Sequence, residues 1–327
     1  MSTKPLRVGT RASRLALAQT GQMVDRLRRA GYDVVIETVS TRGDTRGDQP
    51  VAALGHDGVF VRELERALLD GRIDVAVHSL KDMPTAPVDG LVIASVPERA
   101  TPFDALVCRA HESLASLPSG AVVGTSSIRR VTQLALARPD LVIKPIRGNV
   151  DTRLGRLDAD DYDALILAAA GLERIGVVDR ITTLLEPPVF WPAVGQGALG
   201  LQVREDDVAA RAAVATLDDA ATHLAVLAER SCLAKLAGGC LAPVAGFARV
   251  VAGQLRLGAR VLEQRGRDVC EITMEEAIAL PAESLTAIRD LAEQCGARVA
   301  SKLLEAGADT MLARMRDVST PGRSSAT

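Results

Sequence analysis

The sequence is poor in aromatic residues, in long apolar runs and in net charge. Its 327 residues include four Phe, two Tyr and one Trp, so the core of a chain with 47% hydrophobic residues must be mainly aliphatic. No uninterrupted apolar run reaches about 18 residues, the length that indicates a membrane span. The net charge of −2 and the lack of a Lys/Arg-rich segment indicate no nucleic-acid partner.

Cysteine is also scarce and shows no paired pattern. There are five cysteines, an odd number, and no two have the CxxC spacing of a metal site. We therefore expect reduced thiols in a cytoplasmic protein rather than a disulfide scaffold. The first residues, MSTKPLRVGT, contain no apolar segment, so we expect no signal peptide. Residues 316–327 are expected to form a disordered tail.

Strand and helix signals alternate regularly through the first two thirds of the chain. The predicted strands are residues 6–9, 34–39, 73–77 and 91–96, and the predicted helices are 13–30 and 60–69. This βαβ pattern indicates a parallel or mixed sheet covered by helices. Residues 43–58 are rich in Gly, Asp and Thr, and we expect them to form a mobile lid.

The pattern then starts again, which predicts a second lobe. RVGTRASR at 7–14 is similar to VVGTSSIRR at 122–130, and proline-containing segments cross between the lobes near 97–103 and 186–200. After about residue 217 the signals change to a helix and short strands. We expect an α/β fold with two binding-protein-like lobes joined by a two-segment hinge, plus a smaller α+β C-terminal domain. The expected domains are 1–97 with 198–216, then 103–191, then 220–315.

Three predicted strand ends combine glycine with hydroxyl and arginine side chains. They are GTRAS at 9–13, GTSSIRR at 124–130 and IRGNVDTR at 146–153. Glycine permits close approach of a ligand, a helix N-terminus attracts anions, and arginine binds carboxylates through two donors. Each motif alone would indicate no more than a capped helix with surface arginines. Together they predict a cleft that binds a ligand with several negative groups.

VHSLKDMP at 77–84 places polar residues directly after an apolar strand. Asp82 has two interpretations. It could cap a turn before Pro84, or it could be a carboxylate that moves a proton or stabilises a cationic intermediate. Lys81 would be a further anion contact.

Cys240 lies in LAGGCLAP at 236–243, where two glycines leave room for a bulky group at the sulfur. It is the candidate for a covalent attachment or a nucleophile. The alternative is a small buried apolar side chain, which is our interpretation of the other four cysteines.

Longer motifs carry a resemblance to a known family from about residue 6 to about residue 315. They are TRASRLALAQ, TRGD, GVFVRELERALL, DVAVHSLKDMP, VGTSSIRR, RGNVDTRL, LAAAGLERIG, PAVGQGALG and GGC, in that order. The chain resembles porphobilinogen deaminase, also called hydroxymethylbilane synthase. The resemblance implies a monomeric cytoplasmic transferase of porphyrin and haem biosynthesis. It would join four porphobilinogen units head to tail into hydroxymethylbilane, releasing ammonia.

The resemblance also implies a cofactor and a set of site residues. A dipyrromethane cofactor would be joined by a thioether to Cys240 and would carry the growing oligopyrrole chain, with Asp82 as the catalytic residue. The residues implied to bind cofactor or substrate are Arg11, Ser13, Phe60, Ser79, Lys81, Thr125, Ser126, Ser127, Arg129, Arg130, Arg147, Gly148, Arg153, Arg174 and Gln196.

One departure from the family pattern lies before Phe60, where GHDGVF has Asp57 at the place of a lysine found in many bacterial members. We therefore leave His56 and Asp57 out of the predicted site. Two alternatives to the enzyme remain open at this point. One is a non-catalytic two-lobe protein that binds a polycarboxylate, and the other is a different cysteine-dependent enzyme that uses Cys240.

Overall fold

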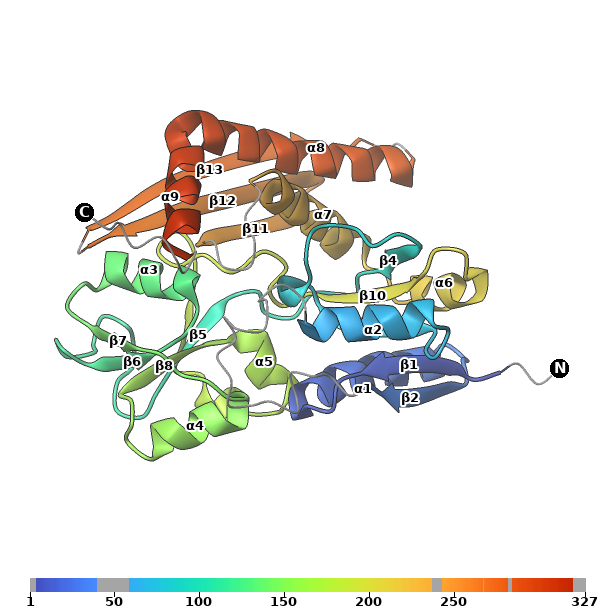
Figure 1. The fold of residues 1–327 in the computed structure, drawn as a ribbon, viewed down its shortest axis with the longest axis horizontal. Helices are drawn as coiled ribbons and strands as arrows, with labels where there is room; N and C mark the ends of the chain where they lie inside the picture. Colours follow the sequence, from blue (N-terminus) through green and yellow to red (C-terminus); the bar gives the residue numbers. More distant parts are fainter. Residues whose placement is uncertain (1–3, 40–58, 237–242, 267, 282–283, 320–327) are drawn as a thin grey trace, which may run out of the picture.

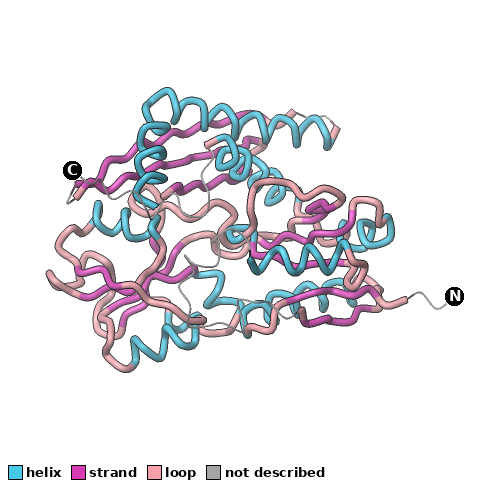
Figure 2. The backbone as a smooth tube through the Cα atoms, viewed as in Figure 1, coloured by secondary structure: helices cyan, strands magenta, loops and turns pink. Residues whose placement is uncertain are grey.

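The computed structural model describes residues 4–39, 59–236, 243–266, 268–281 and 284–319. They form two α/β lobes side by side and a third domain that lies across both (Figure 1). Each part has its own sheet, and helices cover the sheet faces (Figure 2). The expected fold class, with two lobes and a smaller C-terminal sheet domain, is confirmed.

The first lobe is built on a five-stranded sheet in the order β2-β1-β3-β10-β4. Its strands are β1 (Leu6–Thr10), β2 (Val34–Thr38), β3 (Val75–Ser79), β4 (Leu91–Ser95) and β10 (Leu199–Arg204). Its helices are α1 (Arg14–Arg29), α2 (Val59–Leu69) and α6 (Val208–Ala215). β1 pairs in parallel with β2 and β3, whereas β10 is antiparallel to β3 and β4.

The second lobe repeats this plan in a sheet ordered β7-β6-β8-β5-β9. Its strands are β5 (Asp104–Cys108), β6 (Val122–Gly124), β7 (Val142–Lys144), β8 (Ala164–Ala168) and β9 (Thr183–Leu185), and its helices are α3 (Ile128–Ala137), α4 (Val150–Asp158) and α5 (Ala169–Arg174). β6 is parallel to β7 and β8, and β5 is antiparallel to β8 and β9. The chain enters the second lobe along β5 and returns to the first lobe along β10. Each of these strands lies inside its sheet and is antiparallel to both neighbours. The similarity of the two glycine-threonine motifs therefore corresponds to a repeated topology.

The third domain has an antiparallel sheet of β11 (Val244–Val251), β12 (Gln254–Arg265) and β13 (Asp268–Ala279). The helices α7 (Ala220–Lys235), α8 (Leu285–Leu303) and α9 (Asp309–Ser319) complete it. α7 begins where the Asp219 side chain accepts a hydrogen bond from the backbone N–H of Thr222, at 2.8 Å. Its core is aliphatic, as the composition predicts, with Leu255, Val261, Val299 and Leu303 all 0% exposed.

The chain crosses between the lobes twice, in an outward crossing near 97–103 and a return crossing at 186–200. The single tryptophan, Trp191, joins the return crossing to the second lobe and the third domain. The backbone C=O of Trp191 accepts hydrogen bonds from Arg129 Nη1 at 2.5 Å and Gln133 Nε2 at 3.0 Å, both on α3. Its ring lies against β12, where a Cβ added to Gly258 would come within 2.2 Å of the indole. Arg260 of the same strand lies over the ring at 5.7 Å. Trp191 therefore connects the second lobe to the third domain.

Candidate active site

The SLKD segment forms a short turn at the end of β3. A 3-10 helix spans Leu80–Asp82, and the Leu80 side chain is only 1% exposed. The Leu80 N–H donates to Ala198 C=O at 3.1 Å, next to β10. With Leu80 anchored in the core, its polar neighbours Ser79 and Lys81 are half-buried, and Asp82 is exposed.

Charges from both lobes act on Lys81. Burial lowers the pKa of its ammonium, the charges of Arg130 and Arg129 lower it further, and those of Asp82 and Asp104 oppose them. Because Arg129, Arg130 and Asp104 belong to the second lobe, charges of the second lobe act on this turn of the first lobe. The sequence alone does not reveal this interaction.

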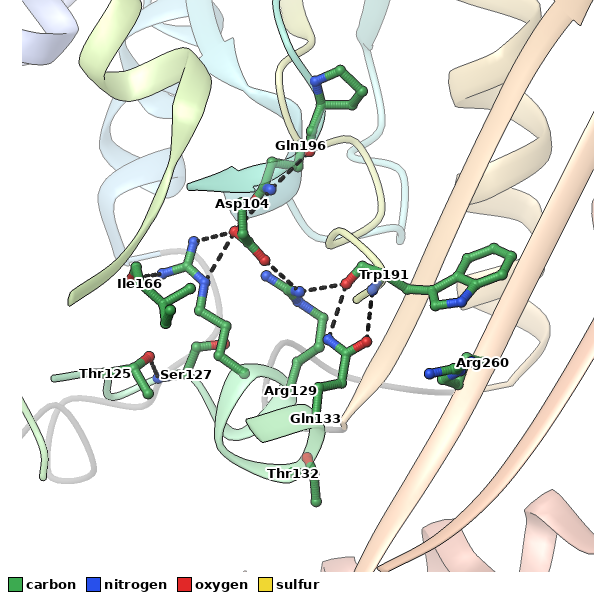
Figure 3. Close-up of polar contacts among 12 residues, drawn as sticks. Asp104, Thr125, Ser127, Arg129, Thr132, Gln133, Ile166, Trp191, Gln196 and Arg260 are labelled. Atoms are coloured by element: carbon green, nitrogen blue, oxygen red, sulfur yellow. Dashed lines mark hydrogen bonds and ion pairs between the residues drawn. The ribbon is translucent and has the colours of Figure 1, made fainter. Parts of the chain in front are cut away.

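Arg129 and Arg130 lie in the first turn of α3, buried against a carboxylate. They are 5% and 7% exposed, and Asp104 is 0% exposed. Arg130 Nη2 lies 2.7 Å from Asp104 Oδ1, and Arg129 Nη1 lies 2.8 Å from Asp104 Oδ2. Figure 3 shows Asp104 between Arg129 and Gln196. Two guanidinium groups face one carboxylate, so the cluster keeps a positive charge.

The arginines determine the ionisation of Asp104. Burial alone would raise the pKa of this carboxyl, but the charges and hydrogen bonds of Arg129 and Arg130 hold it far below the usual range. The carboxylate in turn fixes both arginines, and Arg130 Nη1 also donates to Ile166 C=O at 2.9 Å. The pair is therefore held in place before any ligand binds.

Gln196 lies next to Asp104 on the side away from Arg129 and is 1% exposed. Its Nε2 is 2.8 Å from Pro102 C=O and 3.0 Å from Asp104 Oδ1, so it ties the return crossing to the outward one (Figure 3). The resemblance implied that Gln196 binds cofactor or substrate. In the structure Gln196 contacts Asp104, the carboxylate that pairs with both arginines.

Three hydroxyl side chains of the predicted set, those of Ser13, Thr125 and Ser126, make hydrogen bonds within the first or the second lobe. Ser13 Oγ accepts from the N–H of Ala16 at 3.3 Å and so caps α1. Ser126 Oγ donates to Ile146 C=O at 2.7 Å and accepts from Ile146 N–H at 3.0 Å, which joins two loops. Thr125, which is 2% exposed, accepts from Ser127 N–H at 3.3 Å. Arg11, half-buried, lies between β1 and α1.

The loop from β7 to α4 presents two further arginines. Gly148 has φ +100°, and a Cβ there would lie 2.8 Å from Thr152, so the turn requires glycine. Arg153 Nε donates to Gly148 C=O at 2.9 Å, and burial and the charge of Arg130 lower the pKa of Arg153. Arg147 is exposed and makes no side-chain hydrogen bond or ion pair with the described part of the chain.

Arg174 lies at a different place. Its Nη2 donates to Gly197 C=O at 2.6 Å, and burial lowers its pKa to about 10. It lines a pocket of about 440 Å³ formed with α1 and the outward crossing. No other predicted site residue among those described lines this pocket, so the pocket is separate from the turn that carries Asp82.

Two predicted site positions, Cys240 and Phe60, lie wholly or partly outside the described residues. Cys240 lies outside the described residues, as do the expected lid at 43–58 and residues His56 and Asp57. The backbone of Phe60 lies in α2, but its side chain is outside the description. Their roles remain predictions.

The sequence did not predict the role of Glu229, a buried carboxylate on α7. Glu229 is 0% exposed and lies 2.6 Å from Arg99 Nη1. It also accepts hydrogen bonds from the N–H of Gly195 at 2.6 Å and of Ala248 at 2.8 Å. It thus ties the third domain to both crossings. Nothing local in the sequence signals this contact, because its partners are 19 to 130 residues away.

The described residues contain no group of three or more His, Cys, Asp or Glu side chains that could hold a metal ion. None of the described helices is long and apolar enough to cross a membrane.

Comparisons with known proteins agree on one family. The family model described as "Porphobilinogen deaminase, dipyromethane cofactor binding domain" matches residues 6–212, and "Porphobilinogen deaminase, C-terminal domain" matches residues 223–305. A protein of Acidothermus cellulolyticus named porphobilinogen deaminase is 47% identical over 97% of this chain and 93% of its own length. One from Bordetella parapertussis with the same name is 46% identical over 95% and 96%. The crystal structure of a methionine-binding protein shows a loose likeness, with TM-score 0.40 and 16% identity over 65% of this chain and 89% of that one.

Proposed function

The chain belongs to the porphobilinogen deaminase family, and from this premise we propose how its residues carry out the reaction of a hydroxymethylbilane synthase. The enzyme is a transferase of porphyrin and haem biosynthesis. It joins four porphobilinogen units head to tail into the linear tetrapyrrole hydroxymethylbilane and releases one ammonia per unit. The observation that carries the assignment is the match of both family models, which together cover most of the chain.

The positive charge around the SLKD turn fits the dipyrromethane cofactor. Each of its pyrroles bears carboxylate side chains, and the arginine pair with Asp104 retains a positive charge beside Lys81. Exposed Arg147 adds donors that the described chain does not use. When bound, the cofactor supplies the pyrrole carbon to which the first substrate unit is joined.

We propose that the following residues hold the carboxylates and rings of cofactor and substrate: Arg11, Ser13, Phe60, Ser79, Lys81, Thr125, Ser126, Ser127, Arg129, Arg130, Arg147, Gly148, Arg153, Arg174 and Gln196. For Gln196 and the hydroxyl residues Ser13 and Ser126, the contacts above support an indirect part, in which they fix the loops that carry the arginines. Cys240 is the proposed attachment point of the cofactor, through a thioether.

Asp82 is the proposed catalytic residue. Its carboxylate is exposed at the turn, whereas Asp104, the other acid that acts on Lys81, is buried and already paired with two arginines. Loss of ammonia from porphobilinogen leaves a cation conjugated with the pyrrole ring. In its protonated form the Asp82 carboxyl can pass a proton to the leaving amine, and the carboxylate that remains stabilises the cation.

For the domain bounds we propose those predicted from the sequence, 1–97 with 198–216, 103–191 and 220–315. The three sheets, each confined to one of these parts, support them. The third domain differs in one respect, because α9 continues to Ser319, four residues into the expected tail 316–327. We further propose a cytoplasmic monomer with no nucleic-acid partner. The two alternatives, a non-catalytic binding protein and a different cysteine enzyme, are not favoured, because the family match covers both lobes and the third domain.

A stoichiometric assay tests the reaction. Purified protein should consume four porphobilinogen molecules and release four molecules of ammonia for each hydroxymethylbilane formed. Porphobilinogen loss can be followed with Ehrlich's reagent, and ammonia by a coupled assay. Binding of porphobilinogen without ammonia release would instead support the non-catalytic alternative.

A further inference from the structure

Two consecutive residues of α7 reach two different parts of the other domains. Glu229 contacts both crossings, as described above, and Arg230 contacts the turn that carries Asp82. α7 ends at Lys235, five residues before Cys240. This helix therefore links the proposed attachment point of the cofactor to the proposed catalytic turn.

Arg230 binds the backbone directly after Asp82. Its Nη1 donates to Met83 C=O at 3.0 Å and its Nη2 to Pro84 C=O at 2.6 Å. One turn earlier on the same face of α7, Val226 packs in one apolar cluster with Leu80 and Met83. The helix thus holds both the apolar and the polar side of the turn.

The turn has little to hold it in place by itself. The hydrogen bond that closes the 3-10 helix, from Met83 N–H to Leu80 C=O, is long at 3.4 Å. The Ser79 side chain makes no capping hydrogen bond to this helix. Leu80 fixes the start of the turn in the core, and the contacts from α7 fix the backbone that follows Asp82.

The charge of Arg230 also reaches the strand before the turn. The pKa of His78 is lowered to about 4, mainly by burial and also by the charge of Arg230, while the hydrogen bond with Gln202 acts in the opposite direction. His78 Nε2 lies 3.0 Å from Gln202 Oε1 in the core, so the imidazole is neutral and fixed. The positive charge of Arg230 thus acts on the strand end, while its donors bind the turn.

Building on the function proposed above, we propose that Arg230 is a positioning residue for the reaction. Its two donors on consecutive carbonyls set the place of the Asp82 carboxylate relative to the helix that leads to Cys240. A guanidinium fits two acceptors at once in a fixed geometry, which a lysine ammonium does not. A misplacement of about 1 Å at a catalytic group can lower a rate by about 10²-fold.

Replacement by methionine tests this role, because Arg230→Met keeps much of the apolar stem and removes the donors. We expect kcat to fall by about 10- to 100-fold, with KM changed by less than about threefold, and with the cofactor mass still present on the protein. The matched control is Arg260→Met, since Arg260 Nη2 also donates from the third domain to a crossing carbonyl, Pro188 C=O at 2.8 Å. That variant should keep kcat within about twofold of the parent.

A double-mutant cycle separates positioning from a general structural role. If Arg230 acts through Asp82, adding Arg230→Met to Asp82→Asn should lower kcat by less than about twofold further. Trp191 emission reports whether the third domain is docked in each variant. Should Arg230→Met fail to fold, Arg230→Lys is measured instead, with a smaller fall in kcat expected because one donor contact is lost.

Three outcomes would overturn the proposal. They are an unchanged kcat in the Arg230 variant, a full further loss in the Asp82→Asn background, and an equal loss in the Arg260→Met control. Failure of the proposed function itself is seen separately, as an absence of porphobilinogen turnover by the parent protein.

Discussion

Asp82→Asn should lower turnover of porphobilinogen by about 10²- to 10⁴-fold, the range attributed to a positioned acid–base group. The amide has the shape of the carboxylate but can neither carry its negative charge nor transfer its proton. Because the Asp82 side chain is exposed, the free energy of unfolding should change by no more than about 0.5 kcal/mol. Steady-state kinetics with urea unfolding of the same samples measures both quantities.

Asp89→Asn provides the matched control for this variant. Asp89 is also exposed and lies in the same lobe, seven residues further along the chain. It should leave turnover unchanged. Near-parental turnover in Asp82→Asn would remove Asp82 from its proposed role, whatever the control shows.

Asp104→Asn should produce the largest loss of stability, about 3–5 kcal/mol in the free energy of unfolding, because it leaves two buried guanidinium groups without their counter-charge. Asp104 is 0% exposed, with ion-pair distances of 2.7 Å to Arg130 and 2.8 Å to Arg129. Urea unfolding at neutral pH measures the loss. Asp140→Asn, which removes a half-exposed partner of Arg138 in the same lobe, should cost much less.

The contribution of Asp104 to the free energy of unfolding should decrease as the pH falls. Its pKa is lowered in the folded state, so its contribution is complete above the unfolded pKa of about 4 and decreases as the pH falls toward the folded value. The difference in unfolding free energy between the parent and Asp104→Asn should therefore narrow below about pH 4. A difference that stayed constant down to pH 3, or that grew, would contradict the assigned ionisation.

The sequence predicts the repeated βαβ plan because the glycine-threonine turns and apolar strands are local signals. The predicted strand 73–77 corresponds to Val75–Ser79, so Ser79 lies at its end and the polar turn follows. β13 was not predicted, because its four acidic residues interrupt the apolar pattern of the segment. β5 was missed because it lies directly behind a crossing segment rich in proline and charge.

The site was predicted only as far as its motifs extend. SLKD and GTSSIRR identify side chains that act on one another in the structure. The charges of Arg129 and Arg130 lower the pKa of Lys81. The groups that fix those side chains could not be predicted, because Asp104, Glu229 and Arg230 act on residues in other segments of the chain. Charged residues on a helix or after a proline carry no signal of such long-range pairing. The geometry of the fold alone determines these contacts.

The most direct test of the account is the intact mass of the purified protein from a host that makes porphobilinogen, together with peptide mapping. We expect an added mass equal to one dipyrromethane, located on the peptide that contains Cys240, and further additions in steps of one pyrrole unit after brief exposure to porphobilinogen. Cys240→Ser should lack the added mass. An unmodified parent protein, or the same adduct on another cysteine, would contradict the account.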